Sequence, residues 1–464
     1  MKDNTSYRYA NENPCNMCMP MGGIISFKGV EKSMVIIHGS QGCSTYMRRH
    51  IAEHFNEPVD VASSSLNEKG TIYGGENNLR KGLDNLIKLY NPGLIGVLTT
   101  CLAETIGEDI ERITSDYLKD RGLTDLPVVA VSTPGYGGTH TEGYFLALKK
   151  IIYRLAGKAG KNSRINIIVP SLSPADIREI KRILHVMDVD CILFPDYSDT
   201  LDRPFERPYK KVPDGGTRLA DIAMMPGAAA TIQMGVTAGD NISPGGYLES
   251  HFGVPLYNLP IPMGIENTDL FVETLKNLTG NDVPENLRQE RGRLLDCMVD
   301  SHKYNFEGRS VVFGEPENVY AIVKTCLENG IEPVVVATGG KSNKLTELLK
   351  SCLNGCRGNV HFLDETDFSE IREKSKESAA NIAIGHSDGR YLTEREGIPL
   401  VRHGFPIHDR VGGQRLLSVG YLGTTMFLDR ITNTLLENKY GSYRSNMYQK
   451  FYQNTGDNPL QTMR

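Results

Sequence analysis

The chain has 464 residues, of which 39% are hydrophobic and 23% charged, and its formal net charge is −5. This length exceeds what one hydrophobic core supports and predicts two to four domains. The slight acidic excess excludes the basic surface of a nucleic-acid-binding protein, and no apolar run approaches the roughly 20 residues that span a bilayer. The polar segment 1–13 lacks the apolar centre of a secretion signal. We therefore expect a cytoplasmic protein whose nine cysteines are thiols or metal ligands.

Residues 1–160 are predicted to form an α/β domain. This domain begins with a loop-rich arm over 1–21. Short apolar runs that are typical of buried strands alternate here with amphipathic segments that are typical of helices. The predicted strands are 34–37, 94–101 and 128–132, and the predicted helices are 44–54, 75–90, 103–117 and 141–155.

Residues 161–304 are predicted to form a second α/β domain. Its first helix should begin after Ser173, which is a plausible N-cap residue, with Pro174 in the first turn. The polar segment 196–221 is rich in Pro and Gly and is interpreted as a surface or interface loop. The other predicted elements are strands 164–169, 191–194 and 254–259, and helices 246–252, 268–278 and 285–304.

Residues 305–440 show the most regular alternation of strand and helix, and 441–464 are expected to be a tail. Short strands separated by helices imply right-handed crossovers and a doubly wound parallel sheet. The predicted fold class is therefore α/β, with three Rossmann-like doubly wound domains and mainly parallel sheets. The strands of this third domain are predicted at 310–313, 333–338, 360–363, 381–384 and 400–401.

Glycines follow several of these last strands, but they do not form a known nucleotide-binding motif. Neither G-x-G-x-x-G nor G-x-x-x-x-G-K-[ST] occurs at a strand end. We therefore expect that this chain hydrolyses no nucleotide itself.

Three cysteines lie at predicted strand ends or loops in the first domain. Cys43 lies in the turn 38–43, Cys101 ends the strand 94–101, and Cys18 lies in the Pro/Gly-punctuated loop 13–22. Open α/β sheets bind ligands at the carboxyl ends of their strands, where helix N-termini lower the pKa of a thiol. A lone cysteine in such a place is as readily a buried thiol. Three of them together predict one soft-metal centre.

Three thiols are one fewer than the four ligands of a typical iron–sulfur cluster. Either a fourth ligand comes from elsewhere, or the centre is shared with a second subunit. Cys15 forms a Cys-x-x-Cys pair with Cys18, which also leaves a zinc site open. No second pair at zinc spacing follows, which does not favour that site. Because three thiols already supply one half of a shared cluster, we interpret Cys15 as a spare loop thiol.

These stretches make the chain resemble the β-type subunits of the nitrogenase component 1 family. The likeness extends over almost the whole length. The matching stretches are Asn13-Pro14 with Cys18-x-Pro20-x-Gly22, His38-Gly39-Ser40-Gln41-Gly42-Cys43, His54-Phe55-Asn56-Glu57-Pro58, Gly74-Gly75-x-x-Asn78, Thr99-Thr100-Cys101-x-x-Glu104-x-x-Gly107-Glu108-Asp109, Gly404-Phe405-Pro406-x-x-Asp409-Arg410 and Val419-Gly420-Tyr421-x-Gly423.

The resemblance implies a homologous α-type partner subunit, usually in an α2β2 assembly. Each subunit would offer three cysteines to an iron–sulfur cluster at the interface, and Cys18, Cys43 and Cys101 match the β-type set. The cluster would be an [8Fe-7S] P-cluster type or a [4Fe-4S] cluster. A separate ATP-dependent iron–sulfur reductase would pass electrons through it to the active metallocluster of the partner. No catalytic residue is therefore expected in this chain.

Other residues carry weaker implications of the same resemblance. Glu57 matches a residue that helps to bind a structural divalent ion between β-type subunits. In the molybdenum–iron β subunit, a serine that can bind the oxidised cluster stands at the place of Gly135. This chain has no side chain for that ligation, while ligation by the backbone stays open.

Further candidate site residues are polar side chains near the cysteine-bearing turns and near the strand ends of the third domain. His38 and Glu104 flank the cysteine-bearing turns and are interpreted as orienting hydrogen-bond partners. A second constellation in the third domain is interpreted first as an interface and second as a wall facing a ligand; it comprises His386, His403, His408, Asp409 and Arg410.

Three functions fit these observations. The first is the electron-relaying β subunit of a nitrogenase or a nitrogenase-like reductase. The second is the β-type half of a scaffold that matures the nitrogenase cofactor, which the glycine at 135 favours and the complete cysteine set does not. The third, from a different class, is a structural subunit with zinc at Cys15 and Cys18. We favour the first.

Overall fold

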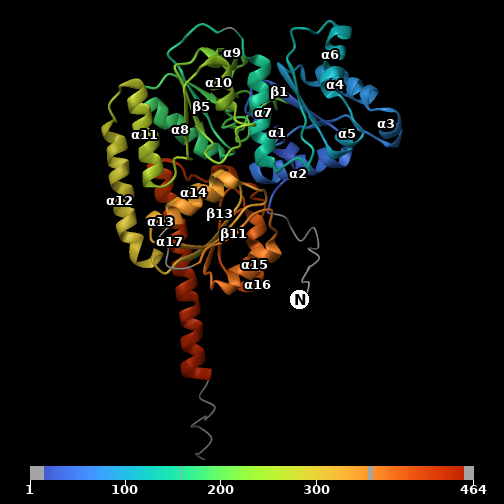
Figure 1. The fold of residues 1–464 in the computed structure, drawn as a ribbon. Helices are drawn as coiled ribbons and strands as arrows, with labels where there is room; N and C mark the ends of the chain where they lie inside the picture. Colours follow the sequence, from blue (N-terminus) through green and yellow to red (C-terminus); the bar gives the residue numbers. More distant parts are fainter. Residues whose placement is uncertain (1–14, 158, 354–358, 454–464) are drawn as a thin grey trace, which may run out of the picture.

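The computed structural model describes residues 15–157, 159–353 and 359–453, which form three parallel sheets flanked by helices (Figure 1). Every pairing between the named strands is parallel. Each sheet is covered by helices that connect successive strands, as parallel pairing requires. The predicted fold class is therefore confirmed. The domain boundaries at 160, 304 and 440 stay a prediction.

The first sheet has the strand order β2-β1-β3-β4. Its strands are β1 Ser33–His38, β2 Ala62–Ser63, β3 Leu94–Thr99 and β4 Val128–Val131. Its helices are α1 Met19–Lys28, α2 Gln41–Phe55, α3 Glu68–Tyr73, α4 Glu76–Tyr90, α5 Cys101–Thr105, α6 Ile110–Arg121 and α7 His140–Leu155. The central strands β1 and β3 are buried along their whole length, because helices cover both faces of the sheet.

The second sheet has the order β6-β5-β7-β8. Its strands are β5 Ile165–Ile168, β6 Cys191–Phe194, β7 Ala230–Met234 and β8 Leu256–Leu259. Its helices are α8 Pro174–Val186, α9 Leu219–Met224, the 3-10 turn η1 Met225–Gly227, α10 Pro244–Phe252, α11 Ile265–Thr279 and α12 Glu285–Asn305. The Ser173 hydroxyl accepts a hydrogen bond from the Asp176 amide, so the predicted N-cap of α8 is confirmed.

The third sheet has five strands in the order β11-β10-β9-β12-β13, which confirms the predicted five-stranded parallel sheet. Its strands are β9 Arg309–Phe313, β10 Glu332–Ala337, β11 His361–Leu363, β12 Ile382–Gly385 and β13 Leu400–Arg402. Its helical segments are α13 Pro316–Glu328, α14 Asn343–Leu353, α15 Phe368–Glu377, η2 Ser387–Gly389, α16 Arg390–Glu396, η3 Gly413–Arg415, α17 Gly420–Tyr448 and the π-helical turn η4 Gln449–Gln453.

Two local predictions for the first domain are wrong. The single helix predicted over 103–117 is two helices, because Gly107 adopts a φ of 77° after α5 and the Asp109 side chain then caps α6. The loop predicted over 1–21 ends earlier, because α1 begins at Met19 and has a proline in its first turn. Residues 1–14 of that arm lie outside the described residues.

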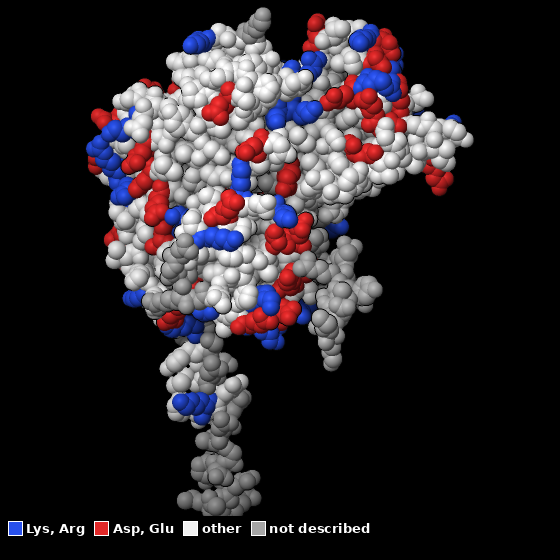
Figure 2. Space-filling model, viewed as in Figure 1, with Lys and Arg blue, Asp and Glu red and all other residues white. Residues whose placement is uncertain are grey.

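Helix α1 joins the first two sheets. Every residue of α1 is buried, and Figure 1 shows it beside α7 between the two sheets. One hydrophobic cluster includes residues of all three sheets, so the core is continuous from one sheet to the next. Figure 2 shows positive and negative side chains interspersed over the visible face. No helix in the described part of the chain is long and apolar enough to cross a membrane.

Candidate metal centre

The turns that carry Cys43 and Cys101 lie side by side because β1 and β3 are neighbouring parallel strands. Their register pairs His38 with Thr99, and the Thr100 amide donates to the His38 carbonyl at 3.1 Å. Cys43 then lies in the first turn of α2, and Cys101 is the first residue of α5. The predicted placement of these two cysteines at strand ends is therefore confirmed.

Cys18 reaches the same edge through close packing of α1 against α7. A Cβ on Gly22 would lie 1.7 Å from the His140 carbonyl oxygen, and one on Gly143 would lie 2.0 Å from the Met19 carbonyl oxygen. Only glycine permits this approach, because any side chain would force the helices apart. Cys18 is the N-cap residue of α1, so the packing of the helix also fixes the position of the thiol.

The loop between β4 and α7 places Gly135 between two of the thiols. A Cβ on Gly135 would lie 2.8 Å from the Cys18 Sγ and 3.2 Å from the Cys101 Sγ. The Gly135 amide donates a hydrogen bond to the Cys101 Sγ at 3.1 Å. Both sulfur atoms therefore approach one point, and the glycine leaves that point free.

Electrostatics also link the three thiols. Burial raises the pKa of Cys18 to about 11, and the negative charges of Cys101 and Cys43 add to the effect. Cys101 is exposed, and the other two are half-buried. The described cysteines, these three among them, are free thiols. The edge of the sheet is thus open to the surface at Cys101. Its three thiols form no disulfide with one another.

Within the described ranges, no group of three or more His, Cys, Asp or Glu side chains is arranged to hold a single metal ion. The same finding gives no support to a zinc site at Cys15 and Cys18. Iron–sulfur clusters are held by cysteine thiolates, so the chemistry of these three free thiols fits one side of a cluster.

Polar side chains hold the ligand turns in place. Glu104 accepts hydrogen bonds from the hydroxyls of Thr99 and Ser132, both at 2.5 Å, which ties α5 to the ends of β3 and β4. His38 is buried between the Ser64 hydroxyl at 2.9 Å and the Glu108 carboxylate at 3.3 Å. These contacts support the interpretation of His38 and Glu104 as orienting residues.

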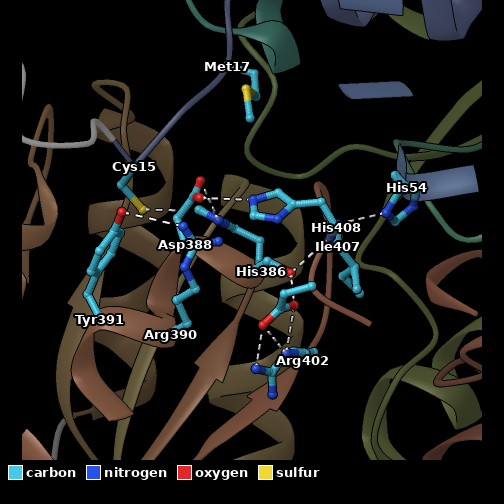
Figure 3. Close-up of polar contacts among 12 residues, drawn as sticks. Cys15, Met17, His54, His386, Asp388, Arg390, Tyr391, Arg402, Ile407 and His408 are labelled. Atoms are coloured by element: carbon cyan, nitrogen blue, oxygen red, sulfur yellow. Dashed lines mark hydrogen bonds and ion pairs between the residues drawn. The ribbon is translucent and has the colours of Figure 1, made fainter. Parts of the chain in front are cut away.

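Cys15 takes part in a different network, at the edge of the third sheet. Its Sγ lies 3.6 Å from the His386 Nε2, at the end of β12, and its amide donates to the Thr366 carbonyl. Figure 3 shows the thiol pointing toward His386. Cys15 is 2% exposed, and burial raises the pKa of its thiol strongly. It therefore anchors the arm to the third sheet, where the sequence indicated only a spare thiol.

The network continues through Asp388, which lies between two histidines. Its carboxylate is 3.5 Å from the His386 Nδ1 and 3.3 Å from the His408 Nε2. Although burial opposes ionisation, these two partners lower the pKa of Asp388 to about 2. Asp409 instead forms a bidentate ion pair with Arg402. Within this chain the constellation is internally paired, and its role as an interface stays a prediction.

His403 lies apart from that network. Its Nε2 contacts the Ser418 hydroxyl at 3.1 Å, and burial together with Arg430 lowers its pKa to about 4. It is therefore a neutral histidine in the core between the second and third sheets rather than part of one polar wall with His386 and His408.

Glu57 is engaged in an ion pair. Its carboxylate accepts hydrogen bonds from the Arg203 amide and from the Arg203 Nε, both at 3.2 Å. Burial raises the pKa of Glu57 against the opposing effect of Arg203. The role in binding a divalent ion that the resemblance implies for Glu57 stays a prediction.

Two contributions to these sites have no clear signal in the sequence. One is the Gly135 amide, because a backbone donor is invisible to residue patterns. The other is Glu315, which is buried and accepts from the His140 ring at 3.1 Å and from the Phe405 amide at 3.3 Å. A buried glutamate directly after a strand is the one sign that could have drawn attention to Glu315.

Comparison with known proteins places this geometry in a family. The family model for nitrogenase component 1 type oxidoreductases matches residues 18–436. The nitrogenase molybdenum-iron protein beta chain of Methanothermobacter thermautotrophicus is 37% identical over 92% of this chain and 95% of its own length. The vanadium-iron protein beta chain of Trichormus variabilis is 34% identical over 91% and 93%.

The solved structures agree with the sequence relatives. A structure of nitrogenase Cp1 at pH 6.5 superposes with a TM-score of 0.88 at 34% identity, covering 92% of this chain and 94% of that one. The three-cysteine edge lies within the region that the family model matches. The chain therefore belongs to the nitrogenase component 1 family of oxidoreductases, as one of its β-type subunits.

Proposed function

We propose that this chain relays electrons as the β subunit of a nitrogenase or a nitrogenase-like reductase. Cys18, Cys43 and Cys101 would hold one side of an iron–sulfur cluster whose other side belongs to an α-type subunit. The observation that carries the proposal is the convergence of the Cys18 and Cys101 sulfurs beside Gly135, on an edge open at Cys101. Three ligands on an open edge fit a shared cluster better than a closed one.

The residues around the thiols suit such a group. An iron–sulfur cluster supplies one-electron transfer when it is bound. The Gly135 amide donates to the Cys101 sulfur, and the Ser40 hydroxyl lies 3.6 Å from the Cys43 sulfur. Hydrogen bonds to thiolate sulfurs stabilise negative charge on them and thereby raise the reduction potential of a bound cluster. The chain thus contributes ligands and also sets part of their electrostatic environment.

Gly135 also limits what this loop does. A serine at this place would put its hydroxyl beside the Cys18 and Cys101 sulfurs, whereas glycine offers only its backbone amide. We therefore propose that ligation does not change here through a side chain when the cluster changes its oxidation state. The amide of Gly135 is the one group of this residue that can respond.

The remaining partners follow from the same assignment. An ATP-dependent iron–sulfur reductase would deliver electrons to the shared cluster, and the metallocluster that reduces the substrate would lie in the α-type subunit. The assembly would be α2β2. Glu57 would join a divalent ion where two β subunits meet, after giving up part of its ion pair with Arg203.

The alternative is a β-type scaffold subunit for maturation of the iron–molybdenum cofactor, and the lack of a serine at Gly135 favours it. The complete set of three cysteines and the likeness to beta chains of molybdenum-iron and vanadium-iron proteins favour the relay.

Metal analysis before and after turnover separates the two functions. The chain is purified without oxygen together with its partner, and iron, sulfide, molybdenum and vanadium are measured per αβ pair alongside electron paramagnetic resonance. A relay keeps its iron through turnover with the ATP-dependent reductase. Iron that falls on mixing with a cofactor-free acceptor would identify a scaffold, and zinc without iron would contradict both functions.

A further inference from the structure

The first sheet has an open edge along strand β4. This strand is the last in the order β2-β1-β3-β4, and it pairs with β3 alone. The Ile95 amide donates to the Pro127 carbonyl at 3.0 Å, and alternate residues of a parallel strand bond to the same neighbour. The amides and carbonyls of Val128 and Ala130 therefore face away from β3. In the described part of the chain, the Ala130 amide and carbonyl have no hydrogen-bond partner on that side.

Helices α6 and α7 lie on either side of this edge and form a groove along it. Val128 belongs to one hydrophobic cluster with residues of α6, and Val129 belongs to another with residues of α7, so the two helices cover opposite faces of the sheet (Figure 1). The groove has a volume of about 340 Å³. We call it the β4 groove and define it by Leu118 and Lys119 of α6, Val128 and Ala130 of β4, and Tyr153 and Arg154 of α7.

The β4 groove carries an excess of positive charge. Lys119, Lys150 and Arg154 line it, and Glu111 is the one carboxylate among its described lining residues. Lys150 and Glu111 form an ion pair at 2.9 Å that joins α7 to α6. Within the described residues, neither Lys119 nor Arg154 forms an ion pair, and the Arg154 Nε donates to the Val128 carbonyl at 3.4 Å. Two exposed cations are thus available to a ligand.

The edge of the second sheet has a groove of similar size without this property. It runs along the edge strand β6 and also has a volume of about 340 Å³. Its lysine and arginine side chains are already paired, because Lys181 contacts Asp196 and Arg218 contacts Asp221. Charge complementarity therefore favours an acidic occupant at the β4 groove and not at the edge of the second sheet.

We propose that the β4 groove binds an extended acidic segment of another protein, which pairs with β4 as a fifth strand of the first sheet. Strand addition of this kind takes its affinity from the free amides and carbonyls of an edge strand, and its specificity from the alternate side chains. Acidic side chains of the segment would face Arg154 on α7, and apolar side chains would face Leu118 on α6. Arg154 would exchange its hydrogen bond with the Val128 carbonyl for a carboxylate, which leaves this carbonyl to the added strand.

The β4 groove is remote from the cysteine turns. Helix α7 begins at His140, and Arg154 lies fourteen residues further along the helix, about 20 Å away. Val128 is the first residue of β4, whereas the turns of Cys43 and Cys101 follow the last residues of β1 and β3. The groove and the cysteine turns therefore lie toward opposite ends of parallel strands. The inference goes beyond the proposed electron relay and does not depend on it.

Synthetic peptides test the proposal in the complete chain, co-purified with its partner subunit. The probe is a fluorescently labelled hexapeptide of alternating glutamate and valine, and fluorescence anisotropy measures its binding. A version with every backbone amide methylated keeps the charge but donates no ladder hydrogen bond, and a version with lysine for glutamate reverses the charge. We expect both versions to bind at least about ten-fold more weakly than the probe. Equal binding of the methylated version would overturn strand pairing, and no binding of the probe would overturn the proposal as a whole.

Hydrogen exchange and charge reversal locate the contact. The Ala130 amide should exchange about ten-fold more slowly when the probe is bound, because the added strand accepts its hydrogen bond. Lys119→Glu and Arg154→Glu should each weaken binding about five-fold, whereas Lys88→Glu, at an exposed position of α4, should leave it unchanged. The thermal unfolding midpoint serves as the folding control, because all three side chains are exposed. Unchanged exchange at Ala130, or equal effects of the three variants, would overturn the proposal.

Discussion

Cysteines lie at two sheet edges of this molecule, and their surroundings differ. At the first edge, Cys18, Cys43 and Cys101 lie on neighbouring turns, Cys101 is exposed, and the sulfurs of Cys18 and Cys101 approach one point beside Gly135. At the edge of the third sheet, Cys15 is buried against His386. Both edges are carboxyl ends of parallel strands. The difference lies in whether the polar groups find their partners inside the chain.

The comparison indicates that a thiol is available as a metal ligand where the fold does not enclose it in a network of polar side chains. His386, Asp388 and His408 form a closed chain of contacts around Cys15. The three-cysteine edge has no such set of cations or imidazoles in the contacts described, and the Gly135 amide is the donor at Cys101. The first edge is therefore suited to bind a group from outside the chain, and the second is suited to hold the chain together.

The strongest way to break the first edge is to fill the space at Gly135. In Gly135→Val the new side chain would meet the sulfurs of Cys18 and Cys101, so we expect cluster iron and electron transfer to fall about 10–100-fold. Iron analysis and turnover assays measure the loss. Gly42→Ala is the matched control, because its Cβ meets nothing closer than 3.7 Å. A normal iron content in Gly135→Val would contradict the position that we assign to the cluster.

The second edge should respond in stability rather than in iron content. His386→Ala removes the partner of Cys15 and one of the two histidines beside Asp388, so we expect a loss of about 2–4 kcal/mol in unfolding free energy. Cluster iron should stay unchanged. Urea unfolding measures the effect, with His251→Ala at an exposed position as the control. A loss of iron with unchanged stability would show that the two edges share one function.

The buried carboxylate of Glu317, which precedes the third sheet's second strand in the chain, should make the stability of the protein depend on pH. Glu317 of α13 accepts from the Thr237 amide and hydroxyl, and burial raises its pKa to about 7. The unfolded chain ionises near pH 4.5, so the folded state loses stability as the pH rises from 4.5 to 7, by roughly 3 kcal/mol at most. Glu317→Gln removes this loss.

We therefore expect Glu317→Gln to be more stable than the parent chain at pH 8 and equal to it near pH 4.5. Urea unfolding at both pH values checks this. Glu347→Gln makes the same chemical change at an exposed position and should have no effect. An equal effect of Glu317→Gln at the two pH values would contradict the assigned cause.

The smallest effect is expected at Glu57. Its ion pair with Arg203 is partly exposed, so Glu57→Gln should cost about 1 kcal/mol in the isolated chain. In the assembly it should lower the divalent metal that is not part of a cluster, which metal analysis after mild chelation measures. Unchanged metal would show that Glu57 serves only the ion pair.

The sequence predicts the first edge better than the second. Cys43 and Cys101 follow apolar strands, and parallel strands bring their carboxyl ends together, so their proximity follows from local patterns. The position of Cys18 depends on the contact of Gly22 and Gly143 with facing backbone, which no periodicity reveals. The partner of Cys15 lies 371 residues away, so its role depends on tertiary packing alone. Likewise Gly107 divides a helix that the apolar spacing predicts as continuous.

The most direct test is the iron and sulfide content of the co-purified assembly in Cys101→Ala and Cys15→Ala, prepared side by side without oxygen. The account predicts that Cys101→Ala loses most of the iron of the shared cluster while its body stays folded. It predicts that Cys15→Ala keeps this iron and unfolds more readily. Full iron in Cys101→Ala, or a loss confined to Cys15→Ala, would contradict the assignment of Cys18, Cys43 and Cys101 as the ligands.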